Sequence, residues 1–505
     1  MSLSETLTRF LALGLVSTTG LLGCASDTGG KSSGRTGGAG GASTGTATTG
    51  SPTGTGGNTG GTGGGIGTGG SGGSGIGTSD AATGGFNCKN LVCFQNSCKG
   101  GGCIEKECTN GSTTSISGVV YDPAGINPLY NVIVYVPNSK TEPIPTGATC
   151  DACGKASGEP ITSTLTNAKG EFKLDNVPIA DNVPIVIQVG KWRRQFTIPK
   201  PAACQDTRLS DRNQTRMPRN KSEGDIPRIA LTTGNADALE CLLRKIGISE
   251  SEMTPETGAG RINFYAGDKG APKYNGTLNG GAPFTPAPTF WSNANSLKGY
   301  DIVLLSCEGI EVSTNKSQQA LNAMLEYVNA GGRVFASHWH NYWLEKGPAP
   351  LPTVATFEHH PDLPNPFTTN IDMSFPKGKA MAEWLVNVGS AAPLGQLIIT
   401  EGKHTVNRES QTPGVSQRWV FSTSPVSVQY LSFNTPVGVE EEKQCGRMVF
   451  SDIHVSAQDE STPTTAYPDG CKTTSMTDQE KALEFMLFDL SACVIKDTKP
   501  PIPPK

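Results

Sequence analysis

Histidines and acidic residues with the potential for chemistry are concentrated in one part of this 505-residue sequence. All six histidines fall between positions 338 and 454. Three short polar groups there each follow an apolar run: Cys307-Glu308, His338-Trp-His340 and Asp452-Ile-His454. Imidazoles with a carboxylate can hold zinc or another divalent metal. The candidate metal ligands are His338, His340, His454 and Asp452. The same region could instead supply a general acid and base, for which the candidates are His338, His454 and Glu308.

A purely structural role is the competing interpretation of these groups. A polar side chain after a buried strand often pairs with loop backbone groups that would otherwise be buried without a partner. Trp339 could contact a ligand, or it could cover the end of a sheet. Cys307 is interpreted as an inert buried thiol, because no activating partner lies near it in the sequence. The sequence leaves open a ligand pocket without chemistry, a metal site and metal-free catalysis.

The elements that must position these groups alternate between apolar strands and one-faced helices. Strands are predicted at residues 229–232, 262–265, 302–305, 334–337, 397–400, 419–422, 428–433 and 448–454. Helical spacing of apolar residues separates several of them, as in Leu321, Met324, Leu325 and Val328. This alternation predicts an α/β domain over residues 224–495, with a parallel sheet covered on both sides. The three polar groups should then meet at the carboxyl edge of that sheet.

This arrangement resembles the class I glutamine amidotransferase-like (flavodoxin-like) fold, in its trehalose-utilisation-type branch. In that family the strand after a helix ending in Gly delivers a nucleophilic Cys, and here the helix ends at Gly331-Gly332 and His338 takes the place of that Cys. His454 matches the placement of the family's catalytic His, but Val455-Ser456 replaces the usual Pro-Glu. The resemblance therefore implies the architecture and argues against glutaminase activity.

Residues 112–222 read differently, as short strands separated by Gly, Pro and Asn. Such a pattern predicts a small all-β sandwich. The strands at 116–121 and 132–136 and the turn at 166–172 resemble the carboxypeptidase regulatory-like domain, a transthyretin-like sandwich grouped with carbohydrate-binding-like folds. Trp192 and Arg193 could form a sugar-stacking patch. The alternative is an edge strand whose charges lie in water.

The N-terminal part predicts export and a tether. Residues 1–24 read as a signal peptide whose apolar run is too short to span a bilayer. The run ends in Leu21-Leu22-Gly23-Cys24, which resembles a lipobox, so Cys24 is the expected lipidation site. The resemblance favours the outer membrane of a Gram-negative bacterium, and the head could face either side of it. Residues 25–86 are predicted to be a disordered Gly/Ser/Thr-rich linker, and residues 496–505 a disordered tail.

Cysteine usage fits an oxidising compartment, because the chain has 14 Cys and an export signal. Residues 87–111 form a Cys-rich segment with one Cys at every fifth position, interpreted as disulfide-stapled. Cys150 and Cys153 are expected in structural pairs that could involve Cys204. Lipidation of Cys24 leaves an odd number, so one thiol should be free, and Cys307 is the candidate. The expected half-cystines are Cys88, Cys93, Cys98, Cys103, Cys108, Cys150, Cys153, Cys204, Cys241, Cys445, Cys471 and Cys493.

Charge and composition bear on function only by exclusion. The net charge is −4 and no concentrated basic stretch exists, so nucleic acid is not an expected partner. The preferred hypothesis is a cell-surface lipoprotein with a non-catalytic binding role, for a carbohydrate or a surface protein. The alternative is an extracellular metal-dependent hydrolase that uses the histidines of the α/β domain, with zinc as the possible cofactor.

Overall fold

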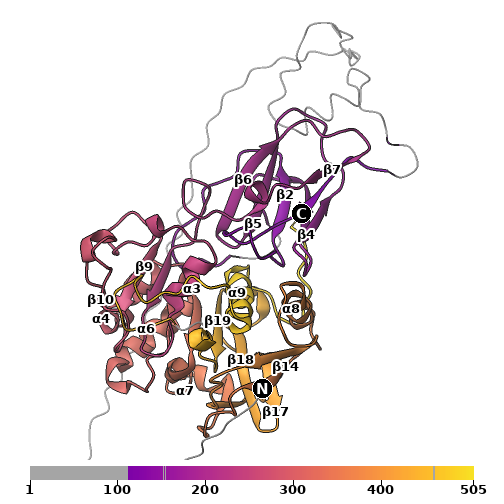
Figure 1. The fold of residues 1–505 in the computed structure, drawn as a ribbon. Helices are drawn as coiled ribbons and strands as arrows, with labels where there is room; N and C mark the ends of the chain where they lie inside the picture. Colours follow the sequence, from indigo (N-terminus) through magenta and orange to yellow (C-terminus); the bar gives the residue numbers. More distant parts are fainter. Residues whose placement is uncertain (1–107, 109–111, 152, 154, 459–460, 505) are drawn as a thin grey trace, which may run out of the picture. The chain divides into compact units, whose positions relative to one another are not determined.

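The computed structural model describes residues 108, 112–151, 153, 155–458 and 461–504 (Figure 1). All described residues belong to one compact unit within residues 79–505. The signal peptide, the lipidation site Cys24, the linker, and Cys88, Cys93, Cys98 and Cys103 lie outside the described residues.

Two small sheets form the first part of the described chain. One is three-stranded in the order β4-β1-β7 and the other four-stranded in the order β3-β2-β5-β6. Their strands are β1 (Ser115–Val119), β2 (Ile133–Pro137), β3 (Pro160–Leu165), β4 (Glu171–Leu174), β5 (Val183–Val189), β6 (Trp192–Ile198) and β7 (Asp206–Leu209). A short helix, α2 (Arg212–Thr215), follows them. Buried residues of both sheets, such as Ile116 and Val134, belong to one hydrophobic cluster.

A ten-stranded sheet dominates the rest, in the order β10-β9-β8-β11-β12-β19-β18-β17-β14-β15. Its strands are β8 (Ile229–Thr232), β9 (Ile262–Ala266), β10 (Thr285–Pro286), β11 (Ile302–Leu305), β12 (Arg333–Ser337), β14 (Phe367–Ile371), β15 (Gln396–Ile399), β17 (Gln417–Thr423), β18 (Val426–Thr435) and β19 (Gly446–Ser451). A separate pair joins β13 (Ala355–Phe357) and β16 (Val406–Glu409).

The sheet is mixed, which corrects the expectation of a wholly parallel one. Strands from β10 to β19 in this order pair in parallel, whereas β18, β17, β14 and β15 pair antiparallel. Only Ser424 and Pro425 separate β17 from β18. A connection that short can join antiparallel neighbours alone, since a parallel pair needs a crossover of a dozen or more residues.

Helices cover both faces of the parallel part. The longer ones are α3 (Leu239–Lys245), α6 (Gln318–Asn329), α8 (Pro376–Asn387) and α9 (Asp478–Ser491), and the shorter ones are α4 (Ala287–Trp291), α5 (Ala294–Lys298) and α7 (Tyr342–Glu345). Alternate residues of β11 belong to two hydrophobic clusters. Leu304 belongs to the cluster that includes buried residues of α3, α8 and α9, and Val303 belongs to the cluster that includes buried residues of α4, α5 and α6. The first cluster continues into the two small sheets. The sequence Thr477-Asp-Gln-Glu480 has the pattern of a capping box, and the structure has that capping box at the start of α9.

Among the described residues, four disulfides join distant parts of the chain: Cys108–Cys204, Cys150–Cys445, Cys153–Cys493 and Cys241–Cys471. The expectation that Cys204 pairs with Cys150 or Cys153 is therefore wrong. Cys307 is buried and is the free cysteine among the described residues, as expected. The disulfides are compatible with an exported protein. No helix in the described ranges is long and apolar enough to cross a membrane.

The C-terminal tail is ordered through residue 504, which corrects the expectation of disorder from residue 496. Asp497 is 7% exposed and lies 2.7 Å from Arg447, with Lys377 at 3.3 Å. Both cations are themselves buried and also pair with Asp489 of α9. The tail thus completes a buried charge network, because either cation without its partners would be costly in the core.

Two buried carboxyls face each other where the small sheets meet α9. Asp122 and Glu484 hydrogen-bond, and each has one buried oxygen without another partner, Oδ2 and Oε1 respectively. Burial raises the pKa of Asp122 to about 6, and burial together with the charge of Asp122 raises the pKa of Glu484 well above its usual value. A proton shared between the two carboxyls accounts for both orphan oxygens.

Glu484→Gln should stabilise the protein at alkaline pH. The amide is neutral at every pH and can donate a hydrogen bond to Asp122, as the protonated Glu484 carboxyl would. The folded state binds the proton of the pair more tightly than the unfolded chain does, so wild-type stability should fall as pH rises above about 4, the ordinary pKa of a carboxyl group. Chemical denaturation with intact disulfides should show the variant about 1–3 kcal/mol more stable than wild type at pH 8 and little different at pH 4. Glu383→Gln, at an exposed site on α8, is the control. Equal destabilisation of Glu484→Gln at both pH values would refute the shared proton.

The thiol state can be checked by alkylation under denaturing, non-reducing conditions followed by peptide mapping. Among the described cysteines, the reagent should modify Cys307 and spare all eight half-cystines. Modification of Cys150 or Cys153 would contradict the long-range pairing. A Cys307→Ser variant identifies the labelled peptide.

Candidate functional site

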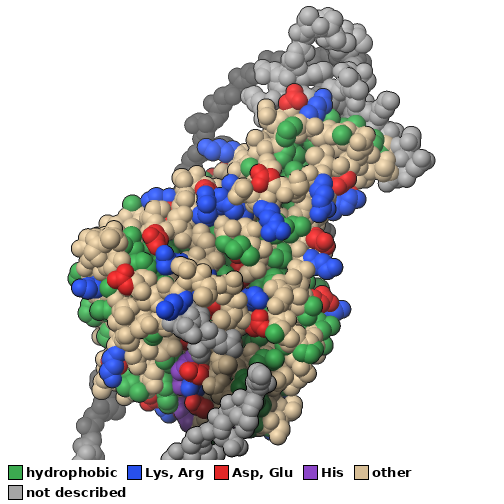
Figure 2. Space-filling model, viewed as in Figure 1, with side chains coloured by type: hydrophobic (Ala, Val, Ile, Leu, Met, Phe, Trp, Pro, Cys, Tyr) green, Lys and Arg blue, Asp and Glu red, His purple; other side chains and the backbone are tan. Residues whose placement is uncertain are grey.

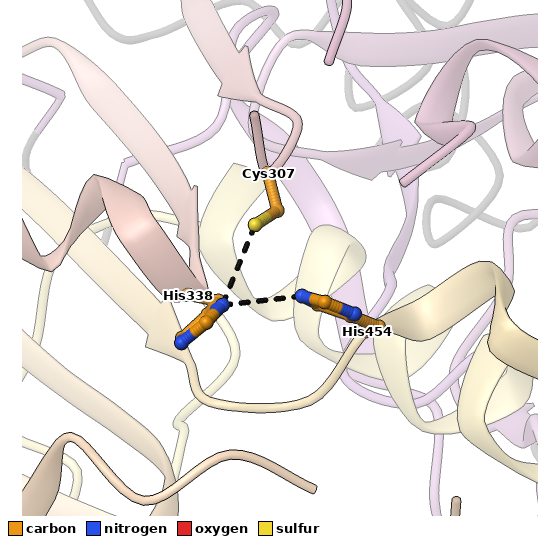
Figure 3. A group of neighbouring side chains, drawn as sticks. All are labelled: Cys307, His338 and His454. Carbon is orange, nitrogen blue, oxygen red and sulfur yellow. Dashed lines mark hydrogen bonds between the residues drawn. The ribbon is translucent and has the colours of Figure 1, made fainter. Parts of the chain in front are cut away.

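The site is built from the carboxyl ends of three neighbouring parallel strands. Cys307 follows β11, His338 follows β12 and His454 follows β19. In the sheet β12 lies between the other two, with Leu305 opposite Ala336 and Ser337 opposite Ser451. Figure 3 shows the three side chains converging on a common point from these strand ends.

The donor atoms of the three side chains are close enough to share a ligand. His338 Nδ1 lies 3.5 Å from Cys307 Sγ and 3.1 Å from His454 Nε2 (Figure 3). All three donor atoms lie within 4.8 Å of one another. Cys307 is fully buried, and His338 and His454 are 5% and 6% exposed. The arrangement has the composition and spacing of a transition-metal site.

His338 occupies a sharp turn from strand to helix. Its φ is +34°, and the 3-10 turn His338–Asn341 begins at this residue. A non-glycine residue with positive φ is strained, and such strain persists only where the surroundings hold it. Here β12 holds one side of the turn, and the buried residues His340 and Asn341 hold the other. The turn directs the imidazole toward β11 and β19.

His454 has a carboxylate on its far side. Its Nδ1 lies 3.0 Å from Glu401 Oε2, at the end of β15. Burial opposes protonation of His454, but hydrogen bonds to Cys307 and Glu401 outweigh it and raise the pKa to about 10. Burial and the neighbouring His454 lower the pKa of His338 to about 2. The two imidazoles thus differ in basicity, and the more basic one is the one that contacts Glu401.

Asp237 links the segment that carries His338 to the segment that carries His454. It is fully buried and accepts hydrogen bonds from the hydroxyls of Ser337 and Ser456, which flank His338 and His454 in the sequence. The backbone N–H of Ser456 also donates to it. Burial raises the pKa of Asp237, and the nearby His454 opposes that shift. The carboxylate fixes the two strand ends relative to each other.

His340 and Asp452 do not face the cluster, which corrects the expectation that they are metal ligands. His340 Nε2 donates to the carbonyl of Ser306 at 2.9 Å, and its Nδ1 accepts from Trp343 Nε1 at 2.9 Å. Asp452 accepts from the backbone N–H of Thr405 at 2.6 Å and from its hydroxyl at 2.8 Å. Both residues have the structural role that was the competing interpretation.

Glu308 does not reach the cluster either, so the acid–base role expected of it has no geometric support. Its carboxylate pairs with Lys316, and both side chains are buried. The other carboxylate oxygen accepts from the backbone N–H of Asp268 at 3.1 Å. A carboxylate paired in this way fixes the loop after β11.

The burial of Trp192 and Arg193 argues against the sugar-stacking patch that was one of their two interpretations. Trp192 is 3% exposed and packs on Phe488 of α9. Arg193 is 7% exposed and pairs with Asp225 at 2.8 Å, so its charge does not lie in water either. Both belong to the contact between the small sheets and the rest of the chain.

Trp339 lies closer to the site and is half-buried. Its ring stacks on His359 with a centroid distance of 5.8 Å and lies 4.7 Å from the His338 ring. The His359 ring forms a hydrogen bond with the carboxylate of Glu345, and the His360 ring forms one with the carboxylate of Glu358. Figure 2 shows histidine at the surface beside acidic side chains. Trp339 and His359 are thus partly exposed side chains next to His338.

Sequence reasoning missed two participants. Cys307 was dismissed because nothing near it in the sequence could activate it, yet His338, 31 residues away, is its neighbour. The parallel order of the strands was the available signal, since adjacent strand ends share an edge. Glu401 carried no signal, because a single Glu after a short strand is common on loops.

Comparisons with known proteins do not identify a family for this chain. No protein family model and no curated protein matches the chain. A crystal structure of a putative ThuA-like protein from Bacteroides uniformis matches with 10% identity and a TM-score of 0.27, covering 52% of this chain and 90% of that one. A type II cohesin–X-dockerin complex from Acetivibrio cellulolyticus matches with 15% identity and a TM-score of 0.14, covering 29% and 78%. Scores this low do not establish a shared fold.

Proposed function

We propose that this chain is an exported metal-dependent hydrolase whose zinc ion is held by Cys307 Sγ, His338 Nδ1 and His454 Nε2. One observation carries the proposal: three metal-binding side chains from three separate strand ends place their donor atoms within 4.8 Å of one another. Zinc bonds of about 2.0–2.3 Å in tetrahedral geometry put ligand atoms about 3.3–3.6 Å apart. The distances of 3.5 and 3.1 Å fit that requirement with small adjustments.

The number of ligands favours catalysis over a structural role. Structural zinc sites usually have four protein ligands, whereas catalytic sites have three and keep one position for water. A zinc ion in such a site lowers the pKa of its bound water to near 7 and polarises a substrate carbonyl or phosphoryl group. The chain's own contribution is to fix the ligands through Asp237 and Glu401 and to enclose the ion.

The architecture and the location belong to the same proposal. The strained turn at His338, where the amidotransferase-like family carries its nucleophile, supports an amidotransferase-like α/β domain that follows a regulatory-like β-sandwich. The four disulfides support a position outside the cytoplasm. Anchoring to the outer membrane through Cys24 rests on the sequence alone.

Two other functions remain as competitors. The same cluster without metal could act as a thiol–imidazole–carboxylate triad of Cys307, His454 and Glu401, favoured by the bond between His454 and Glu401. The other competitor is a non-catalytic role in binding a carbohydrate or a surface protein. Its three candidate contact residues are Trp339, Trp192 and Arg193, of which Trp339 is half-buried and the other two are buried.

Metal content of the full oxidised chain tests the proposal directly. Elemental mass spectrometry should find about one zinc per wild-type chain. Cys307→Ser, His338→Ala and His454→Ala should each lose most of it, because two remaining ligands do not hold zinc tightly. His360→Ala, at an exposed histidine outside the cluster, should retain it. A folded wild-type chain that takes up no zinc when it is supplied would exclude the metal site.

Activity provides the second test. Wild-type protein should hydrolyse at least one member of a panel of esters, amides, phosphoesters and glycosides, and a chelator should abolish the activity until zinc is restored. Hydrolysis that resists chelation but disappears after alkylation of Cys307 would favour the metal-free triad. The absence of hydrolysis, together with retention on a glycan array, would favour the binding role.

A further inference from the structure

We infer that Glu401 and Gln479 are positioning residues for the cluster, and that together they set the orientation and tautomer in which His454 presents Nε2. This inference rests on the proposed metal site. Neither residue touches the point on which the donor atoms converge. Both act on His454, Glu401 through the ring and Gln479 through the backbone.

Glu401 determines which nitrogen of His454 is free to bind a ligand. A carboxylate can only accept a hydrogen bond, so the 3.0 Å contact requires a proton on His454 Nδ1. When a bound ligand displaces the second proton of the ring, the lone pair lies on Nε2, which faces His338 at 3.1 Å. Metal-binding histidines commonly have such a carboxylate partner, which fixes the ring and increases its basicity.

The backbone at Glu401 is held in an unusual conformation for this contact. Its φ is +51°, although it is not a glycine, and its side chain is 48% exposed. Because the carboxylate is half exposed, water can solvate it in many backbone conformations. Solvation therefore does not explain the positive φ. The strain is understandable if the surroundings hold the residue where it reaches His454.

Gln479 supplies that hold from the first turn of α9. Its side chain is fully buried. Its Oε1 accepts from the N–H of Thr400 at 2.7 Å and from the Thr400 hydroxyl at 3.0 Å. Its Nε2 donates to the carbonyls of Thr400 at 3.2 Å and of His454 at 2.9 Å. One amide thereby bridges the residue before Glu401 and the backbone of His454, with all four of its hydrogen-bonding positions used.

The capping box of α9 keeps this amide in place. Thr477 and Glu480 satisfy each other's backbone N–H groups at the start of the helix, and Glu480 also pairs with Lys245 of α3. Gln479 lies between them in the sequence, so its position follows from the helix terminus. His454 is thus held at two points. Gln479 of α9 bonds its backbone carbonyl, and Glu401 bonds its imidazole ring.

Zinc affinity of the full oxidised chain, measured by competition with a chromophoric chelator at fixed pH, tests the inference. Glu401→Ala should raise the zinc Kd by roughly 10–100-fold, because the ring loses its orienting partner. Glu401→Gln should lie between that variant and wild type, since its amide oxygen can still accept from Nδ1–H but lacks the charge. Gln479→Glu, which keeps acceptors for Thr400 but cannot donate to the His454 carbonyl, should also weaken binding.

Glu358→Ala is the matched control, since Glu358 is another exposed carboxylate bonded to a histidine, His360, at 3.3 Å. Its zinc Kd should equal that of wild type. Thermal unfolding without zinc should show that Glu401→Ala is folded, because its side chain is half exposed. A folded Glu401→Ala with the wild-type Kd would overturn the positioning role and leave the metal site standing. A wild-type chain that binds no zinc would overturn both.

Discussion

Parallel pairing of β11, β12 and β19 is the constraint on which the site depends. Parallel neighbours end on the same edge, so residues that immediately follow them are brought together whatever their separation in the chain. Backbone hydrogen bonds along these strands fix the distances between Cys307, His338 and His454 more firmly than flexible loops would. The buried carboxylate of Asp237 then fastens the strand ends where the sheet itself stops.

Helix α9 connects this edge to the rest of the molecule. Its first turn supports His454 through Gln479, and its middle faces the small sheets through Glu484 and Phe488. Near its end, Asp489 shares the cations Lys377 and Arg447 with Asp497 of the ordered tail. One helix therefore contacts the site, the first part of the chain and the C-terminus. The two small sheets share their hydrophobic cluster with it and are not a loosely attached module.

The sequence was informative where apolar runs decide the outcome. The strands of the parallel part and the one-faced helices follow from apolar spacing and are present, and the capping box of α9 follows from the types and spacing of Thr477 and Glu480. It was uninformative about partners far away in the chain. The hairpin of β17 and β18 changes the strand direction, Asp497 pairs with Arg447, and Trp192 and Arg193 are covered by elements that no local pattern indicates. His340 was expected in the metal site but has a structural role, and Cys307 was expected to be inert but belongs to the cluster. The sequence did not indicate this, because the neighbours of both residues come from other strands.

The span of the disulfides has a consequence for biosynthesis. Cys150 and Cys153 are neighbours, yet their partners lie 295 and 340 residues further along the chain. With the export that we propose, the polypeptide emerges from its N-terminus, so both thiols meet oxidants long before Cys445 and Cys493 arrive. Oxidation during that interval would join the wrong cysteines. Correct maturation therefore requires either that these thiols stay reduced until translocation finishes or that an isomerase reshuffles the early bonds.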